Sequence, residues 1–221
     1  MLGLSLTGSA FAQPEVKPNS LEAMGCMKLK ECTDDVIAIT SIDQIKEYYR
    51  ETYNQSWQPT KEDETEIIAL INRLNEVGVE VYLAHDQYFM PNNRGLYYTD
   101  VNRLFLNEWF LMDPRALLSV LRHEGWHAAQ DCMAGTINNS FIAVIYDDML
   151  IPQKYKVLAD LRYGMLQPRA IPWEQEAIWA GNKYGMTADA LNACGSGVMW
   201  EEYKPTPLTE KWLVKNGYIK D

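Results

Sequence analysis

The spacing of apolar residues along the chain predicts several helices. The clearest stripe has apolar residues three or four positions apart, namely Ile67, Leu70, Ile71, Leu74 and Val77. This spacing places them on one face of a helix, which we expect over residues 60–77 and which Gly78 ends. Ser41 and Gln44 have the spacing of a capping box, which predicts a further helix over residues 42–54.

The most clearly bounded helix is expected over residues 114–134. Asp113 is favoured just before a helix, Pro114 at its first position, and Gly135 is a common stop. The other expected helices are short: one after Pro152, one over 173–184, one capped by Thr187 and one over 209–216.

Short runs of apolar and β-branched residues predict four strands. They lie at residues 36–39, 79–84, 96–98 and 103–106. A turn at residues 99–102 separates the last two, so we expect these to form a hairpin. The order of strands and helices indicates the α+β class, with a small, mostly antiparallel sheet packed on the helices.

Composition and charge narrow the classes of function. Hydrophobic residues make up 47% of the 221 residues and charged residues 23%, the balance of an ordinary folded protein. The formal net charge of −10 repels phosphate, so we expect no nucleic-acid partner. No segment reaches the roughly 18 consecutive apolar residues of a membrane span, and we expect none.

The start of the chain is typical of an export signal. Residues 1–12 carry no charge, are mostly apolar or small, and end in Ala10-Phe11-Ala12, which fits a signal-peptidase site. No positively charged segment precedes them, so we expect the signal to lack its usual start. Residues 13–20 include two prolines and are expected to form a linker. The predicted location is the periplasm or the outside of the cell.

The four cysteines fit an exported protein. An even number outside the cytosol indicates two disulfides. Cys26 and Cys32 are close in sequence and are expected to pair, which leaves Cys132 to pair with Cys194. Buried thiols are the alternative. There is no C-x-x-C motif, so a four-cysteine zinc site is not supported.

His123, Glu124 and His127 form the pattern H-E-x-x-H within the expected helix 114–134. Residues four positions apart share a helix face, so both imidazoles can reach one ion. Neutral imidazole suits zinc, and a catalytic zinc lowers the pKa of a water to about 7. Glu124 lies about 100° further round the helix, where it can take the proton of that water. We therefore predict one Zn²⁺ per chain, with Glu124 as the general base.

A third protein ligand must come from another segment. No third histidine follows on the same helix, so the metzincin pattern is absent. His85 precedes the motif at a strand end, where a structural or surface role explains it more simply. Glu174 and Glu176 lie near the start of the expected helix 173–184, about 200° apart, so only one can face the ion. The alternative is that both are solvated acids at a helix N-terminus.

These motifs resemble those of gluzincin zinc metallopeptidases, which carry H-E-x-x-H on one helix and a ligand glutamate on a second. Residues 123–137, HEGWHAAQDCMAGTI, are similar to the stretch H-E-x-x-H-A-x-x-D-x-x-A-G-x-I of thermolysin-like enzymes. The resemblance implies a single zincin-like domain over residues 21–204, followed by a tail at 205–221. In the family the third ligand begins an E-x-x-A pattern, which residues 174–177 match; this favours Glu174 over Glu176.

The sequence departs from the family after this pattern. Ile178 stands where the family has Asp or Asn, the carboxylate that contacts a ligand histidine. We expect Asp131 or Glu176 to take its place.

The resemblance also implies where a substrate binds. The family binds a peptide along an edge strand just before the active-site helix, which would be the backbone of Leu96 and Tyr97 here. An ordinary half-buried hairpin is the alternative. A Tyr or His polarises the carbonyl group in the family, and the candidates here are Tyr146, Tyr155, Tyr163 and His85.

The sequence thus predicts an exported zinc-dependent metallopeptidase that acts on a peptide or protein substrate. The alternative is a non-catalytic secreted or surface-attached interaction protein with a structural or vestigial zinc. The presence of Glu124 argues against this alternative, because a structural zinc does not need that residue.

Overall fold

The computed structural model describes residues 17–32, 36–135, 137 and 141–203. The predicted signal peptide, the tail at 205–221 and the helix at 209–216 lie outside these residues. Part of the predicted linker is described, and it is packed against the fold: the Asn19 side-chain amide donates a hydrogen bond to the Phe89 carbonyl at 2.8 Å.

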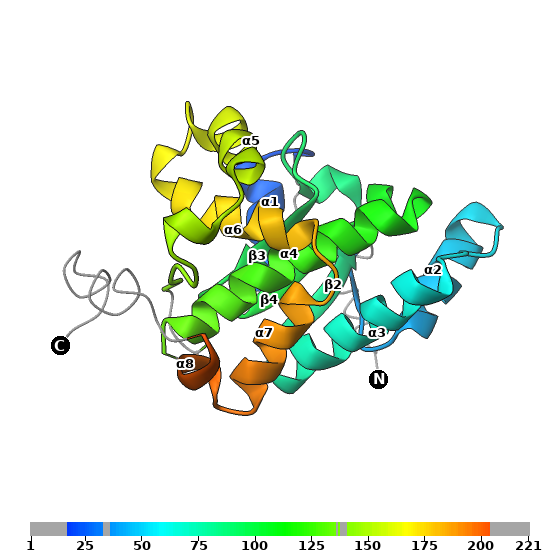
Figure 1. Ribbon diagram of the computed structural model, residues 1–221. Helices are drawn as coiled ribbons and strands as arrows, with labels where there is room; N and C mark the ends of the chain where they lie inside the picture. Colours follow the sequence, from blue (N-terminus) through cyan, green and yellow to red (C-terminus); the bar gives the residue numbers. More distant parts are fainter. Residues whose placement is uncertain (1–16, 33–35, 136, 138–140, 204–221) are drawn as a thin grey trace, which may run out of the picture.

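The described residues form an α+β fold, as predicted (Figure 1). The helices are α1 (Leu21–Leu29), α2 (Ile42–Tyr53), α3 (Lys61–Glu76), α4 (Pro114–Met133), α5 (Gln153–Tyr163), α6 (Ile171–Gly181), α7 (Met186–Gly195) and α8 (Met199–Glu202). The strands are β1 (Val36–Ala38), β2 (Glu80–Ala84), β3 (Gly95–Tyr98) and β4 (Arg103–Asn107).

The four strands form one mixed sheet in the order β1-β2-β4-β3. β1 pairs with β2 and β3 with β4 in antiparallel fashion, whereas β2 and β4 run parallel with Glu80 opposite Arg103. Two of the three strand pairs are antiparallel, which confirms the prediction of a mostly antiparallel sheet. The parallel pair was not predicted; it arises because β4, and not β3, of the hairpin lies beside β2. β3 is an edge strand, as expected.

Helix α4 is the central element of the fold. Figure 1 shows it between the sheet and the pair α6 and α7, and it packs against β3, α3, α6 and α7. Its N-terminus is fixed by the Asp113 carboxylate, which accepts the backbone N–H groups of Arg115 and Ala116. At the other end, Gly135 adopts a φ of +118°, a value that residues other than glycine rarely adopt. Both ends agree with the predicted helix.

Each face of the sheet has its own hydrophobic core. On one face Val81, Leu83, Leu104 and Leu106 pack with α3, α4 and α7. On the other face α1 buries Ala23 and Met27 against aromatic residues that include Tyr82 and Phe105. The sequence analysis did not predict α1, whose N-terminus is capped by the Ser20 hydroxyl.

Two predicted helix boundaries need correction. The helix expected at 173–184 is α6, which begins at Ile171, one residue before Pro172, and ends at Gly181. Thr187 does not cap α7: Gly185 occupies that position, with a φ of +76°. Instead, Thr187 is buried within the first turn, and its hydroxyl donates to the Arg122 carbonyl at 2.9 Å. This bond fixes α7 against α4.

The two predicted disulfides are present, Cys26–Cys32 and Cys132–Cys194. The first joins the end of α1 to the segment after it. The second links α4 to α7 across 62 residues of sequence. Two disulfides are compatible with an exported protein. None of the described helices is both long and apolar enough to cross a lipid bilayer.

Candidate metal centre

The two histidines of the H-E-x-x-H motif lie on one face of α4. Their ring centroids are 5.0 Å apart and the rings are nearly perpendicular. This is the neighbour relation that four-residue spacing on a helix produces. Both side chains are largely buried, with 17% of His123 and 12% of His127 exposed. They face α6, which packs against α4.

Helix α6 brings Glu174 to the histidine pair. One carboxylate oxygen, Oε2, lies 3.4 Å from His123 Nε2, and the other lies 3.7 Å from His127 Nε2. One ligand atom from each of the three residues lies within 4.8 Å of the other two. Bonds of about 2.0–2.1 Å in a tetrahedron put neighbouring ligand atoms about 3.3 Å apart. The two distances between Glu174 and the histidines are close to this value. These residues could therefore hold a metal ion.

The Glu174 carboxylate is buried with a hydrogen-bonding position left unfilled. Its Oε2 lies 3.4 Å from His123 Nε2 but has no hydrogen bond of good geometry among the described residues, although a buried acceptor of this kind normally has one. A coordinated cation would fill this position. Burial opposes the charge of Glu174, but His127, His123 and the Tyr163 hydroxyl outweigh it and hold the pKa at about 2. Burial lowers the pKa of His123, whereas Glu174 and Glu124 raise it, and the net shift is upward.

Glu176, the alternative ligand, lies outside the group formed by His123, His127 and Glu174. Its carboxylate is fully buried and accepts four N–H groups: Trp126 Nε1 at 3.2 Å, Gln130 Nε2 at 2.8 Å, Ile145 N at 3.1 Å and Tyr146 N. Burial raises its pKa to about 7 against the effect of these donors. The geometry therefore favours Glu174 as the third ligand.

Gln130 connects Glu176 to His127, a contact that was not predicted from the sequence. Its amide nitrogen donates to Glu176, so its oxygen faces His127 Nδ1 at 2.8 Å. His127 then carries its proton on Nδ1, and Nε2 is left with a lone pair toward Glu174. This is how ligand histidines are usually oriented. Gln130 lies three residues after His127, so the two side chains are neighbours on the helix surface. This spacing could have predicted their contact from the sequence.

Asp131, the other carboxylate expected to contact a ligand histidine, instead pairs with the edge strand. Its Oδ2 accepts the Tyr97 hydroxyl at 2.7 Å. Its Oδ1 is buried without a hydrogen-bond partner among the described residues. Burial raises the pKa of Asp131 to about 7.

Glu124 lies between the histidines and the edge strand β3. Its carboxylate accepts the backbone N–H of Tyr97, and it is close enough to both histidines for their charges to lower its pKa. Burial is the larger effect, and the net shift of the Glu124 pKa is upward. Gly95 permits this packing, because a β-carbon there would lie 2.7 Å from the Cγ atom of Glu124. Leu96 and Tyr97 therefore lie on the strand that contacts Glu124.

Of the four candidates for polarising a carbonyl, only Tyr163 contacts the group. Its hydroxyl hydrogen-bonds to Glu174; burial raises the pKa of Tyr163, and the negative charges of Glu174 and Glu124 raise it further. Tyr155 packs with Ile151 and Ala159, and Tyr146 stacks on Trp126 with ring centroids 5.9 Å apart. His85 lies before a short turn after β2, where its Nε2 is 3.3 Å from Glu108.

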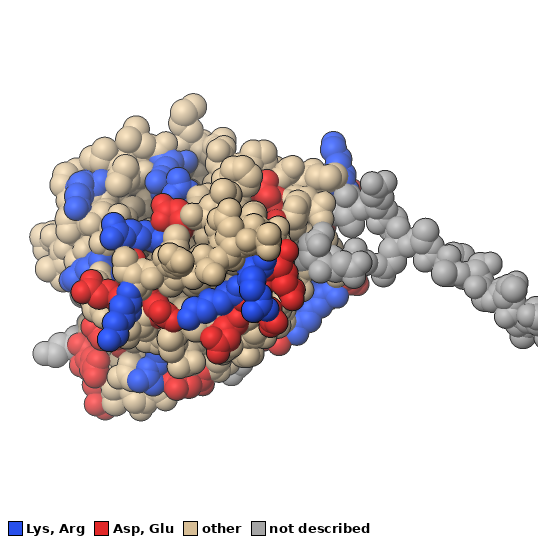
Figure 2. All heavy atoms as spheres, turned by 90° about the vertical axis from the view of Figure 1, so that its right-hand side faces the viewer, with Lys and Arg blue, Asp and Glu red and all other residues tan. Residues whose placement is uncertain are grey.

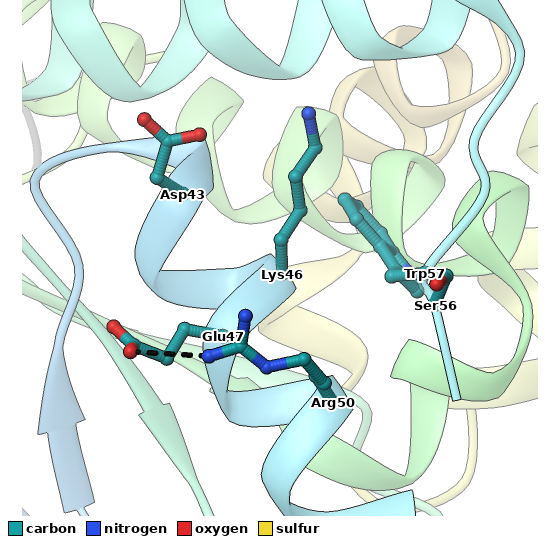
Figure 3. A pocket seen from close by; sticks show the side chains of 6 residues that line it. All are labelled: Asp43, Lys46, Glu47, Arg50, Ser56 and Trp57. Atoms are coloured by element: carbon teal, nitrogen blue, oxygen red, sulfur yellow. Dashed lines mark hydrogen bonds and ion pairs between the residues drawn. The ribbon is translucent and has the colours of Figure 1, made fainter. Parts of the chain in front are cut away.

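A separate hollow of about 410 Å³ lies beside α2 and is lined by Asp43, Lys46, Glu47, Arg50, Ser56 and Trp57 (Figure 3). None of these residues belongs to the metal-ligand group. Its two cations are already paired, Arg50 with Glu47 at 3.4 Å and Lys46 with Glu64. The Trp57 ring nitrogen donates to the Leu111 carbonyl at 2.8 Å. Both cations that line the hollow are therefore already paired with carboxylates.

Comparisons of the chain with protein-family models, with curated proteins and with solved structures found no match. The chemistry of the centre is therefore inferred from its own residues and geometry.

Proposed function

We propose that this protein is an exported zinc-dependent metallopeptidase with a zincin-like active site. The observation that carries the proposal is the convergence of His123, His127 and Glu174 from two helices, with a Glu174 oxygen that has no hydrogen-bond partner among the described residues. Two nitrogens and one carboxylate are a donor set that catalytic zinc sites use. When bound, the ion would supply Lewis-acid chemistry, polarising a carbonyl group and acidifying a water.

In the proposed reaction, Glu124 moves the proton. It follows His123 directly on α4, so helix geometry keeps it beside both histidines. Glu124 takes a proton from the attacking water and returns it to the departing amine, as a general base and then a general acid. A structural metal site has no use for such a neighbouring carboxylate.

The edge strand β3 is the proposed binding surface for the peptide. Its outer side has no neighbouring strand in the described sheet, and Glu124 contacts Tyr97 at that side. A peptide added along Leu96 and Tyr97 would form backbone hydrogen bonds and pass beside Glu124. Tyr163, which donates to Glu174, is the proposed donor to the carbonyl oxygen as negative charge develops.

Turnover by the wild type and by the Glu124→Gln variant tests the proposal. Glutamine keeps the shape and hydrogen-bonding reach of Glu124 but cannot accept the proton. We expect zinc content and unfolding temperature to be unchanged. Cleavage of a peptide selected from a library should fall by about 10²–10⁴-fold, the contribution typical of a general base.

A matched control is Glu51→Gln, because Glu51 is an exposed glutamate on α2. It should leave turnover unchanged. Equal turnover by wild type and Glu124→Gln would remove Glu124 from the mechanism. Absence of cleavage by the zinc-loaded wild type across a broad library would favour the non-catalytic alternative, an interaction protein with a vestigial metal site.

A further inference from the structure

Exposed apolar side chains are concentrated in one segment of the chain. Thirteen large apolar residues are exposed in the described part of the structure, and seven of them lie between residues 149 and 166. The most exposed are Met165 at 98%, Leu166 at 85% and Met149 at 85%. Isolated exposed apolar residues are common on protein surfaces, but such a concentration indicates a binding surface.

Three of these residues share one side of helix α5, and the other four lie before or after it in the chain. Val157, Leu158 and Leu161 lie within about 100° of one another around the helix. Tyr155 and Ala159 lie on the opposite side and are buried against α6. Met149 and Leu150 precede the helix, and Met165 and Leu166 follow it directly. We call the seven exposed residues Met149, Leu150, Val157, Leu158, Leu161, Met165 and Leu166 the α5 face.

The charge around the α5 face is opposite to that of the whole chain. Residues 147–169, which include the whole α5 face, contain four basic residues, Lys154, Lys156, Arg162 and Arg169, and three acidic residues, Asp147, Asp148 and Asp160; the segment is slightly basic in a chain whose formal net charge is −10. Lys156 pairs with Asp148 at 2.6 Å, whereas Lys154, Arg162 and Arg169 are exposed. On the side of the molecule that carries α2 and α3, in contrast, basic and acidic side chains lie interspersed (Figure 2).

We propose that the α5 face docks the protein onto the surface of an anionic lipid bilayer. Apolar side chains that project from a short helix and its two ends can enter the boundary between headgroups and acyl chains, while basic residues bind the anionic headgroups. At 11 residues α5 is far shorter than the roughly 20 needed to span a bilayer. It would lie on the membrane.

Charge also argues against the chain's own tail as the occupant of this face. Residues 204–221 contain four lysines and two acidic residues, so the tail is basic like the α5 face itself. An anionic membrane is the complementary partner. The inference does not depend on the proposed peptidase activity, although α5 also carries Tyr163, which contacts Glu174. Docking through α5 would bring the metal centre close to the membrane surface.

Co-sedimentation of the full chain with lipid vesicles tests the inference without any measurement of zinc or cleavage. We expect binding to vesicles of phosphatidylcholine mixed with phosphatidylglycerol, weaker binding to phosphatidylcholine alone, and loss of the difference at high salt. Failure of the wild type to bind the anionic vesicles would overturn the proposal.

Two double variants separate the apolar and the electrostatic contributions. Leu161→Gln with Met165→Gln should weaken binding at least about tenfold on anionic vesicles. Lys154→Gln with Arg169→Gln should weaken it about 25-fold there, at about fivefold per basic residue, and should change binding to phosphatidylcholine little. Leu21→Gln with Leu29→Gln is the matched control, because these leucines are 76% and 62% exposed but lie on α1.

Unfolding temperatures check that each variant is folded. Equal vesicle binding by the wild type and by Leu161→Gln with Met165→Gln would overturn the proposal, since another segment would then bind the lipid. Sedimentation equilibrium without lipid adds a second test. If the same variant changed the oligomeric state and left vesicle binding intact, the α5 face would be a contact between two copies of the chain.

Discussion

Two carboxylates on α6, separated by a single residue, have opposite surroundings. Glu176 is fully buried and accepts four N–H groups, so its hydrogen-bonding capacity is met by the protein itself. Glu174 faces two imidazole nitrogens at 3.4 and 3.7 Å, and one of its oxygens has no hydrogen-bond partner within the described structure. Glu176 is held by the protein's own donors, whereas Glu174, with His123 and His127, could hold a metal ion.

The two surroundings are connected through one side chain. Gln130 donates to Glu176 and accepts from His127. The hydrogen bonds around Glu176 therefore also orient His127, which faces Glu174. The comparison shows that burial alone does not identify a functional carboxylate. What distinguishes Glu174 is burial together with an oxygen that lacks a well-formed hydrogen bond and two nearby imidazole nitrogens.

Replacing Glu176 or Glu174 by glutamine, one at a time, should change the free energy of unfolding in two different ways. Glu176→Gln places an NH₂ group among N–H donors, so we expect the metal-free protein to lose roughly 2–4 kcal/mol of unfolding free energy. The stability gained on adding zinc should remain. Glu174→Gln should abolish most of that zinc-dependent gain. Urea unfolding with chelator and with zinc measures both quantities, and the comparison fails if the two variants behave alike.

Asp131 is a third buried carboxylate, and it has neither a cation nor a set of N–H donors beside it. Its pKa is raised from 3.8 to about 7, so the native state retains a proton that the unfolded state releases. Stability is therefore lost as the pH rises from about 4 to about 7.

Asp131→Asn removes this titration. The unfolding free energy of the variant minus that of the wild type should rise by roughly 2–3 kcal/mol between pH 5 and pH 8. This figure follows from about 1.36 kcal/mol for each unit of pKa shift. Urea unfolding in the presence of chelator measures the difference. A difference that stays constant with pH would contradict the assignment of a raised pKa to Asp131.

A smaller effect, on zinc affinity, is expected from replacing Gln130, which links His127 to Glu176. Gln130→Met keeps the length of the side chain but removes the hydrogen bonds to His127 and Glu176. Zinc affinity should fall about 10–100-fold, as for other residues that orient ligand histidines. Gln175→Met is the matched control, because that amide donates to Asp148 at 3.0 Å and not to a histidine. Competition with a zinc indicator gives both affinities, and equal losses would show that Gln130 has no specific role.

The sequence predicted the elements whose signals are local. Asp113, Pro114 and Gly135 bounded α4, and four-residue spacing put His123 and His127 on one face. The choice between Glu174 and Glu176 could not be made from the residues alone, because both begin the same helix. The structure favours Glu174, because Trp126 and Gln130 on α4 donate to Glu176, while Glu174 lies beside the histidines.

Features that depend on distant contacts were missed. The helix α1 has little amphipathic periodicity, and it is stabilised by packing of Met27 on the far face of the sheet and by the Cys26–Cys32 disulfide. The parallel pairing of β2 with β4 joins segments about 20 residues apart in sequence, and the hairpin signal did not predict it. Thr187 has the chemistry of a helix cap, but its hydroxyl bonds to Arg122.

The metal content of the wild type and of the His123→Ala variant, measured after dialysis against a weak chelator, tests whether these residues form a zinc site. His123, His127 and Glu174 are proposed to hold a single ion, and removal of one imidazole leaves too few protein ligands for tight binding. We predict one equivalent of zinc per wild-type chain and much less than one in the variant, with both proteins folded. A variant that retains a full equivalent of zinc would contradict the assignment of this metal centre.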